Sequence, residues 1–509
     1  MCYIADNFKI LDHSCIYSII LLNRNESTLF GLMEYLKKDM KEISITDLAG
    51  IIKARVSCAV NREQCVTGVS IDSRAVKDGD CFFAISGDKF DGHDYVSDAF
   101  VNGAVCAVVS KELSGGEFAG KCLIQVDDTI EALGAFAREY RRRAGFKVVA
   151  ITGSAGKTTV RQIIHHVLGR HFKVHQSPKS FNNNIGLPLT LLGAEPDVQI
   201  VVAELGSNHP GEISYLTRIA APDIAVVTNV YPAHLEGFGN LRTIVREKLS
   251  ISEGLNSEGL LIINESLVKW LENYQLPITN NQVETFGKSD NSDYRVNDIV
   301  YEGLSSRFTI EDSGVHLPLA GPGNIENALA AWAVCSRFGV TIDKFASAVG
   351  TLPPVAMRAE PLQIGTLTVL NDCYNANPAS MKNALDILDN IDPSGNRRLV
   401  FICGEMAELG GHSENLHIEL GDLVSRTKIE LLIAVGGPAK VAARAAQAGS
   451  KGKLQIKCFE DTLSACNNLH KLIKDYDIIL VKGSRVAGLE TVIDRLKEIF
   501  ANSGIEKET

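Results

Sequence analysis

The residues best suited to chemistry stand together in the segment TGSAGKTT at residues 152–159. An apolar run at residues 148–151 precedes it, and a helical pattern follows from Thr159. Glycines let a phosphate approach the backbone, helix N-terminal amides attract anions, and a lysine and a hydroxyl can bind phosphate oxygens and a metal ion. The segment therefore predicts ATP binding by Gly153, Ser154, Ala155, Gly156, Lys157, Thr158 and Thr159.

The glycine spacing departs from the common phosphate loop, since two residues and not four separate Gly153 from Gly156. A glycine turn with an exposed lysine is the alternative interpretation. The flanking strand and helix disfavour it, because together they form the strand–loop–helix unit that phosphate binding uses.

Polar side chains follow two further apolar runs. Glu204 comes directly after residues 200–203, and His234 lies beyond residues 224–227. Ligands of doubly wound sheets bind at the carboxyl ends of the strands, so both side chains are candidate metal ligands. The alternatives are a carboxylate that caps a turn and a histidine with a structural role. Nearby Lys248, in the sequence Arg-Glu-Lys, is by pattern alone part of a solvated helical charge cluster.

The chain is long enough for about three domains, because 509 residues exceed what one hydrophobic core can organise. Apolar runs alternate with helical patterns, which predicts an α/β class with three domains. These are a small N-terminal α/β domain, a central doubly wound parallel sheet carrying the phosphate loop, and a C-terminal Rossmann-like domain. The predicted boundaries are an extension at residues 1–40 and domains at residues 41–145, 146–353 and 354–509, with Pro353 and Pro354 in the last linker.

Individual elements are also expected. A helix is predicted at residues 45–55. Strands are predicted at residues 81–85, 104–109, 122–126, 148–151, 200–203, 224–227, 260–263, 399–403, 431–435 and 478–481.

Charge and cysteine content exclude several kinds of partner. The net charge is −10 and no basic run exceeds three residues, which argues against nucleic acid or an anionic membrane surface. The twelve cysteines form no C-x-x-C pair, so we expect reduced thiols and a cytoplasmic location. The apolar stretch at residues 15–22 is too short to span a bilayer. We therefore expect no membrane segment.

Several segments occur in an order that resembles the Mur ligases. They are TGSAGKTT at residues 152–159, NNNIGLP at 182–188, ELG at 204–206, the stretch from Asn229 to His234 and Leu235, and Lys248. The resemblance covers residues 41–502 and implies a monomeric, ATP-dependent amide ligase acting on small molecules. It further implies that a substrate carboxylate is activated as an acyl phosphate before an amine attacks it.

The resemblance also implies the metal site. Thr158, Glu204 and His234 would hold magnesium, and Lys248 would be carbamylated to bind a second magnesium ion. Lys157, His234 and Lys248 are then the expected catalytic residues. The chain departs from the family at Ser250, where an acidic residue is common.

A glycine-rich segment at residues 321–328 resembles the family's G-x-H-N-x-x-N-A sequence near the adenine. Asn324 and Asn327 match it and are expected to contribute to ATP binding. Gly323 stands where a histidine is usual. A loop whose asparagine caps a helix accounts for Asn324 equally well.

The segment NDCYNANPAS at residues 371–380 resembles the branch that adds D-alanyl-D-alanine to a UDP-N-acetylmuramoyl-tripeptide. The segments GEMAELG at 404–410 and KGSR at 482–485 match the same branch. By resemblance, ATP would contact Arg358, Asp372 and Asn375. The two other substrates would contact Ser73, Arg74, Asn183, Asn377, Ser380, Lys482 and Arg485. A surface turn at residues 72–74 and a capped helix at residues 377–380 are the structural alternatives.

Two competing functions remain. One is another ligase of this family, of the meso-diaminopimelate-adding or folylpolyglutamate type, which the segment at residues 371–380 disfavours. The other is a P-loop switch ATPase, for which the expected Asn-Lys-x-Asp element is absent from the sequence.

Overall fold

The computed structural model describes residues 40–56, 64–87, 89–271, 274, 282–392 and 394–501. The apolar stretch at residues 15–22 and nearly all of the expected N-terminal extension lie outside these residues. The described chain divides into two compact units. The first comprises the described residues up to Ile151, with His171–Ala225 and Ser250–Leu260, and the second comprises Thr152–Arg170, Val226–Leu249 and the residues from Leu261 onward.

The first unit opens with a small sheet whose neighbours run in the order β2-β7-β6-β5-β4. From β4 to β7 the strands are parallel, and β2 joins β7 in the antiparallel sense. The core beneath α4 is apolar, with Phe82, Val96 and Ala107 at its centre. The bounds are β1 Ile43–Ser44, α3 Ile45–Ile51, β2 Arg55–Val56, β3 Cys65–Val66, β4 Gly68–Ser70, η1 Ser73–Ala75, β5 Asp80–Phe83, η2 Gly92–Tyr95, α4 Val96–Val101, β6 Cys106–Val109, η3 Gly116–Phe118 and β7 Leu123–Gln125.

The helix predicted at residues 45–55 is shorter than expected. It ends at Ile51 because Lys53 adopts a left-handed φ of 53°, after which Arg55 enters strand β2. Periodicity alone does not mark that turn, since neither glycine nor proline stands there.

A seven-stranded sheet has the order β14-β13-β12-β11-β8-β10-β9. Strands β9, β10 and β8 are parallel, as are β12, β13 and β14. The division between the units falls inside β8, β11 and β12. The bounds are α5 Thr129–Ala144, β8 Lys147–Thr152, α6 Lys157–Leu168, β9 Val174–Gln176, α7 Gly186–Leu192, β10 Ile200–Glu204, α8 Glu212–Ala220, β11 Ile224–Val227, α9 Leu235–Phe238, α10 Leu241–Leu249, η4 Ser250–Gly254, β12 Leu260–Asn264, η5 Glu265–Leu267, α11 Val268–Leu271, β13 Val283–Gly287 and β14 Tyr294–Arg295.

A three-stranded antiparallel sheet follows in the second unit, and the apolar runs had not predicted it. Its strands are β15 Asn297–Glu302, β16 Ser305–Ile310 and β17 Ser313–Leu317, and the helices α12 Pro322–Arg337 and α13 Ile342–Val349 come after it. Strand β15 is half-buried or exposed along its length, so no apolar run marks it in the sequence.

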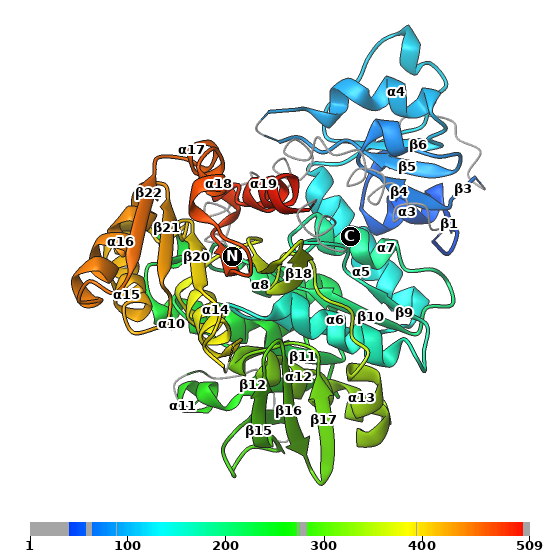
Figure 1. The fold of residues 1–509 in the computed structure, drawn as a ribbon. Coiled ribbons are helices and arrows are strands. Elements are labelled where there is room, and N and C mark those ends of the chain that lie inside the picture. The colour runs from blue at the N-terminus through cyan, green and yellow to red at the C-terminus, as the bar shows by residue number, and fades with distance from the viewer. Residues whose placement is uncertain are drawn as a thin grey trace, which may run out of the picture. The chain divides into compact units, whose positions relative to one another are not determined.

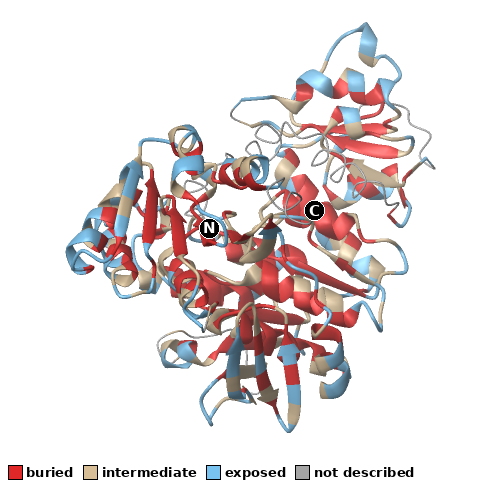
Figure 2. Cartoon of the chain, viewed as in Figure 1, coloured by how far each residue is buried: buried red, intermediate tan, exposed pale blue. Residues whose placement is uncertain are grey.

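The C-terminal sheet has six strands in the order β18-β19-β23-β20-β21-β22 (Figure 1). All pairs are parallel except β18 with β19. Apolar clusters cover both faces, one shared with α14 to α16 and the other with α17 to α19, and the central strands are buried (Figure 2). The bounds are β18 Glu360–Ile364, β19 Leu367–Asp372, α14 Pro378–Asn390, β20 Leu399–Cys403, η7 Gly410–His412, α15 Ser413–Val424, β21 Leu431–Val435, α16 Gly437–Gly449, β22 Gln455–Phe459, α17 Thr462–Cys466, α18 Leu469–Leu472, β23 Ile478–Lys482, η8 Arg485–Ala487 and α19 Glu490–Phe500.

The predicted α/β class with parallel sheets is confirmed, and each predicted strand is present with both ends within two residues of the expected ones. Fully apolar runs were reliable guides because parallel strands covered on both faces cannot alternate with polar residues. Among the described residues no helix combines the length and the apolar character needed to cross a membrane.

Candidate active site

The phosphate loop joins β8 to α6, and its two glycines are required by sterics. Gly156 is the N-cap of α6 with φ 83°, and a Cβ there would lie 2.1 Å from Asn327 Oδ1. Gly153 has φ 148°, and its Cβ would lie 2.0 Å from Thr228 Oγ1. No side chain fits at either position, so the loop backbone stays open to a phosphate.

Asn229 holds this loop in shape. Its Oδ1 accepts a hydrogen bond from Ala155 N at 2.9 Å, and its Nδ2 donates to Ala155 O at 3.1 Å. Its own carbonyl accepts from Ser154 N at 3.1 Å, and Ser154 Oγ donates to Tyr231 O at 3.0 Å. Lys157 Nζ donates to Gly153 O at 2.8 Å, so the side chain of Lys157 folds back onto the phosphate loop. The sequence analysis had named Asn229 only as part of a motif. The sequence signal that could have identified Asn229 is its position after strand β11, shortly before His234 in the chain.

The N-terminus of α12 lies against the phosphate loop through the Asn327 contact with Gly156. Asn324 Nδ2 donates to Ala320 O at 2.8 Å, and Asn324 Oδ1 accepts from Asn327 Nδ2 at 3.3 Å. Both side chains are buried. The N-cap of α12 is Gly321, without a side-chain cap bond, so Asn324 lies within the helix and the alternative that it caps the helix is wrong. ATP binding by Asn324 and Asn327 stays a prediction.

The space beside Gly323, where the family usually has a histidine, is occupied by a neighbouring side chain. Gly323 N donates to Asn383 Oδ1 on α14 at 2.9 Å, and a Cβ at Gly323 would lie 2.8 Å from that oxygen. The Asn383 carboxamide thus occupies the space that a side chain at position 323 would need.

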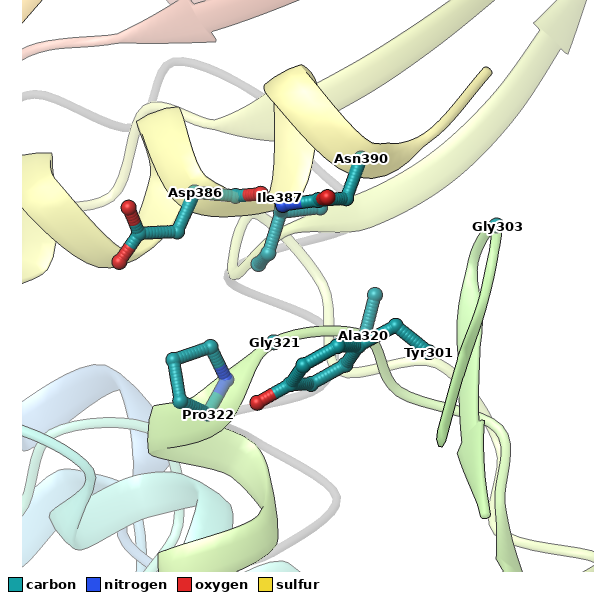
Figure 3. A pocket seen from close by; sticks show the side chains of 8 residues that line it. All are labelled: Tyr301, Gly303, Ala320, Gly321, Pro322, Asp386, Ile387 and Asn390. Carbon is teal, nitrogen blue, oxygen red and sulfur yellow. Dashed lines mark hydrogen bonds between the residues drawn. The ribbon is translucent and has the colours of Figure 1, made fainter. Parts of the chain in front are cut away.

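A pocket of ≈ 220 Å³ lies beside the start of α12 (Figure 3). Tyr301 and Pro322 face Ile387 across it, with Asp386 and Asn390 on the same helix as Ile387. Asp386 pairs with Lys382 at 2.8 Å. The pocket therefore has a mixed lining of apolar side chains and polar ones.

The segment at residues 371–380 is joined to the phosphate loop. Asn377 Nδ2 donates to Ser154 O at 3.2 Å, while Asn377 Oδ1 accepts from Ser380 N at 2.9 Å in a capping box that begins α14. The structural role of Asn377 and Ser380 is thus present. Asn377 also bridges the phosphate loop to the C-terminal sheet, and its sequence pattern predicted only the cap.

Lys482 is almost fully buried, at 1% exposure. Its Nζ forms a salt bridge of 2.7 Å with Asp372 and donates to Asn375 O at 3.0 Å. Parallel pairing sets this contact, because Asp372 and Lys482 are register partners on β19 and β23. In this structure Lys482 contacts protein groups that shape the loop, and substrate binding by Lys482 stays a prediction.

Other residues around this loop have aromatic or polar neighbours. The Arg358 guanidinium lies 4.3 Å from the ring centroid of Tyr374, and Arg485 Nη1 lies 3.8 Å from Met357 Sδ. Between Lys482 and Arg485, the buried Ser484 hydroxyl has no hydrogen-bond partner in the described part of the chain. Ser484 was expected only as a member of the KGSR segment, without a role of its own.

His234 and Lys248 belong to one local structure. His234 precedes α9 with a left-handed φ of 52°, and its Nδ1 contacts Glu408 Oε2. Lys248 is 2% exposed on α10, with its Nζ 5.7 Å from the ring centroid of Phe238 on α9. The solvated charge-cluster interpretation of Lys248 is therefore wrong. The helix turns this lysine inward because Ile244 and Leu249 share its buried side.

The first unit contains the remaining candidates. Glu204, at 3% exposure, ends β10; its Oε1 accepts from Asn182 Nδ2 at 3.1 Å, and its backbone N donates to Ser177 Oγ at 3.1 Å. Asn183 Oδ1 accepts from Gly186 N at 2.8 Å and so supports the start of α7. Asn182 is a neighbour of Glu204 that the sequence analysis had not singled out.

Arg74 lies at the surface of the small sheet, paired with Asp72. Arg74 Nε donates to Asp72 Oδ1 at 2.9 Å and Nη2 donates to Oδ2 at 2.7 Å. Burial raises the pKa of Asp72, but the bonds from Arg74 outweigh burial and leave that pKa below its usual value. Ser73 is buried and its carbonyl accepts from Asn102 Nδ2. The exposed side of the guanidinium leaves donors for an anion.

Within the described residues no group of three or more His, Cys, Asp or Glu side chains could hold a metal ion. The predicted donor set nevertheless differs from such a group, because it includes the Thr158 hydroxyl and Lys248. Hydroxyl and carboxylate oxygens suit magnesium, and a carbamylated lysine would add two more oxygens. The hydroxyl and carboxylate groups of the predicted set are thus of the kinds that magnesium accepts as ligands.

A parallel α/β sheet with a shortened phosphate loop, followed in the chain by a second Rossmann-like sheet, is typical of nucleotide-dependent enzymes. Family models agree along most of the chain: the Mur ligase family catalytic domain matches residues 65–141, the Mur ligase middle domain residues 151–335, and the Mur ligase glutamate ligase domain residues 357–485. The protein belongs to the Mur ligase family.

Two curated relatives in this family carry the same name. The UDP-N-acetylmuramoyl-tripeptide–D-alanyl-D-alanine ligase of Bacillus subtilis is 33% identical over 89% of this chain and 98% of its own length. The Escherichia coli ligase of the same name is 33% identical over 90% and 99%. A crystal structure of MurF from Acinetobacter baumannii superposes with a TM-score of 0.80 at 27% identity, covering 90% of this chain and 99% of its own. The crystal structure of MurF ligase from Thermotoga maritima in complex with ADP superposes with a TM-score of 0.74 at 26% identity, covering 86% of this chain and 98% of its own.

Proposed function

We propose that this ligase joins D-alanyl-D-alanine to a UDP-N-acetylmuramoyl-tripeptide at the expense of ATP, which yields the pentapeptide precursor of peptidoglycan. The observation that carries the proposal is the bond from Asn377 to the phosphate loop. It joins the segment typical of the D-alanyl-D-alanine-adding branch to the residues that would bind ATP. The relatives bearing that activity in their names match nearly the whole described chain.

The domain roles follow from this function. Residues 41–145 would bind the UDP-precursor through Ser73 and Arg74, residues 146–353 would bind ATP, and residues 354–509 would bind the incoming dipeptide. ATP would place its phosphates on the amides of the phosphate loop, at the N-terminus of α6. We further propose a cytoplasmic location, since ATP and UDP-linked precursors are its substrates, and a monomeric state, as the family resemblance implied.

Two reaction steps are proposed. The tripeptide carboxylate attacks the γ-phosphorus of ATP, the bond to the bridging oxygen breaks, and ADP leaves an acyl phosphate behind. The amine of D-alanyl-D-alanine then attacks the acyl carbon, loses a proton, and displaces inorganic phosphate. Lys157 would neutralise phosphate charge during the first step.

Magnesium would be held by Thr158, Glu204 and His234, with a second ion at Lys248 after carbamylation. It would screen the repulsion between the two anions that must meet. The burial of Lys248 is compatible with this role, because the side chain lies inside the protein and not in a solvated surface cluster.

The test is phosphate release from ATP, with the UDP-tripeptide and candidate amines supplied singly and together. Release should require the UDP-tripeptide and D-alanyl-D-alanine at the same time. If meso-diaminopimelate or glutamate stimulates phosphate release and D-alanyl-D-alanine does not, the protein belongs to another branch of the family. Steady hydrolysis without either peptide substrate would support a switch ATPase.

A further inference from the structure

A carboxylate from the C-terminal sheet contacts the histidine expected to bind magnesium. Glu408 lies in the loop after β20, between Cys403 and η7, and its Oε2 is within hydrogen-bond distance of His234 Nδ1. The described residues offer no hydrogen-bond partner to the other ring nitrogen, Nε2. The His234 side chain is 23% exposed and the Glu408 side chain 47%.

The backbone holds the two residues in register. Glu236 N donates to Glu408 O at 3.1 Å, directly beside the side-chain contact. Gly410 packs so closely on this segment that a Cβ there would lie 3.3 Å from Glu236 Cα. Leu416 of α15 packs on the apolar cluster of Leu235 and Phe238. The side-chain pair is thus one of several contacts that join the same two loops.

Both residues adopt an unusual backbone conformation. The φ of His234 is 52° and that of Glu408 is 61°, although neither is glycine. Left-handed φ in a residue with a Cβ costs about 1 kcal/mol or more, and the surrounding packing must compensate for it. Such conformations on both sides of one contact direct the two side chains toward each other.

We infer that Glu408 is a positioning residue for His234. By accepting a hydrogen bond from Nδ1–H, its carboxylate holds the neutral imidazole in the tautomer whose Nε2 lone pair is available to a metal ion. Histidine ligands of metals commonly donate their other nitrogen to a carboxylate in this way, which fixes the ring and raises its basicity. The inference rests on the proposed role of His234 as a magnesium ligand.

The arrangement also links the metal site to the C-terminal sheet. Glu408 belongs to the segment GEMAELG, whereas His234 follows strand β11, and 174 residues separate them. The histidine is oriented only while the loop after β20 is docked against α9. Metal affinity would then depend on the contact between these two loops.

The experiment compares Glu408→Ala and Glu408→Gln with the unchanged protein and with Glu414→Gln, which removes an exposed carboxylate at the start of α15. Manganese binding to the ATP-loaded full-length protein is measured by electron paramagnetic resonance, beside kcat and the magnesium concentration for half-maximal activity. Thermal unfolding checks that each variant is folded.

Glu408→Ala should weaken manganese binding about 10-fold or more and raise the half-maximal magnesium concentration similarly. Glu408→Gln should lose much less manganese affinity than Glu408→Ala, because the amide oxygen of glutamine still accepts a hydrogen bond from Nδ1–H. Glu414→Gln should bind manganese as the unchanged protein does. Equal manganese affinity in Glu408→Ala and the unchanged protein would overturn the inference.

His234→Ala separates this inference from the function on which it rests. If His234→Ala weakens manganese binding while Glu408→Ala does not, only the positioning role of Glu408 fails. If neither variant changes manganese binding, His234 is not a metal ligand and the metal assignment fails as well.

Discussion

Lys482, which is buried, forms a salt bridge of 2.7 Å with the partly buried Asp372 at the carboxyl ends of two adjacent parallel strands. Lys482 also reaches Asn375 O at 3.0 Å, so a single cation closes the start of the loop that carries Asn377. This contact links the C-terminal sheet, through Asn377 and Ser154, to the phosphate loop.

Removal of the Lys482 charge should therefore destabilise the C-terminal sheet and weaken ATP binding. We expect Lys482→Met to cost about 1–3 kcal/mol, because it leaves the partly buried Asp372 carboxylate without its cation, although Ala359 N still donates to it. Urea unfolding and the KM for ATP are the measurements. Lys382→Met, which opens the exposed pair with Asp386, should cost less than about 1 kcal/mol. Equal effects of the two variants would contradict the structural role of Lys482.

Gly156→Ala should abolish ATP binding, because its Cβ would collide with Asn327 Oδ1 at 2.1 Å. Gly211→Ala is a matched control: Gly211 is also a helix N-cap, with φ 95° and ψ −13° against 83° and −12° at Gly156, and nothing lies within 4 Å of its Cβ. Both variants bear the cost of the left-handed backbone, about 1–2 kcal/mol. Calorimetric titration with ATP should show a loss only in Gly156→Ala, and a loss in both would assign the effect to backbone strain.

Substitutions of Asn377 should separate the effect of helix capping from the effect of the contact with the phosphate loop. Asn377→Ser keeps a good N-cap but cannot reach Ser154 O, so we expect a higher KM for ATP with little change in thermal stability. Asn377→Ala loses both contacts and should also cost about 1 kcal/mol of stability. An unchanged KM for ATP in Asn377→Ser would show that the bond to Ser154 is not used in binding.

The stability of the protein should fall at mildly acidic pH because of His417. This fully buried imidazole accepts from Met406 N at 3.0 Å through Nε2, and its Nδ1 lies 2.7 Å from Ser413 O. Burial lowers the pKa of His417, and the Ser413 carbonyl and Glu405 only partly oppose the shift. The folded state thus favours the neutral ring.

The sign of the pH dependence follows from that lowered pKa. The stabilisation is complete above the unfolded pKa of about 6.5 and is lost as pH falls toward the lower folded pKa, by up to about 1.4 kcal/mol per pH unit. Melting temperatures at about pH 7.5 and about pH 5.5 measure the loss. His417→Gln should lose less between these values, whereas His470→Gln, at an exposed position of α18, should lose as much as the unchanged protein. A His417→Gln variant with the full loss would assign the pH dependence to other groups.

The sequence by itself determined the α/β class, the strand positions and the phosphate loop, because fully apolar runs and obligatory glycines leave local signals. It also placed Glu204 correctly at the end of a buried strand. Only the tertiary structure decided which polar groups meet. Lys248 is buried, and Asn383 occupies the space that a side chain at Gly323 would need. Glu408 contacts His234, although 174 positions separate them in the sequence. Such pairings depend on how distant elements pack, and no local pattern of residue types encodes that packing.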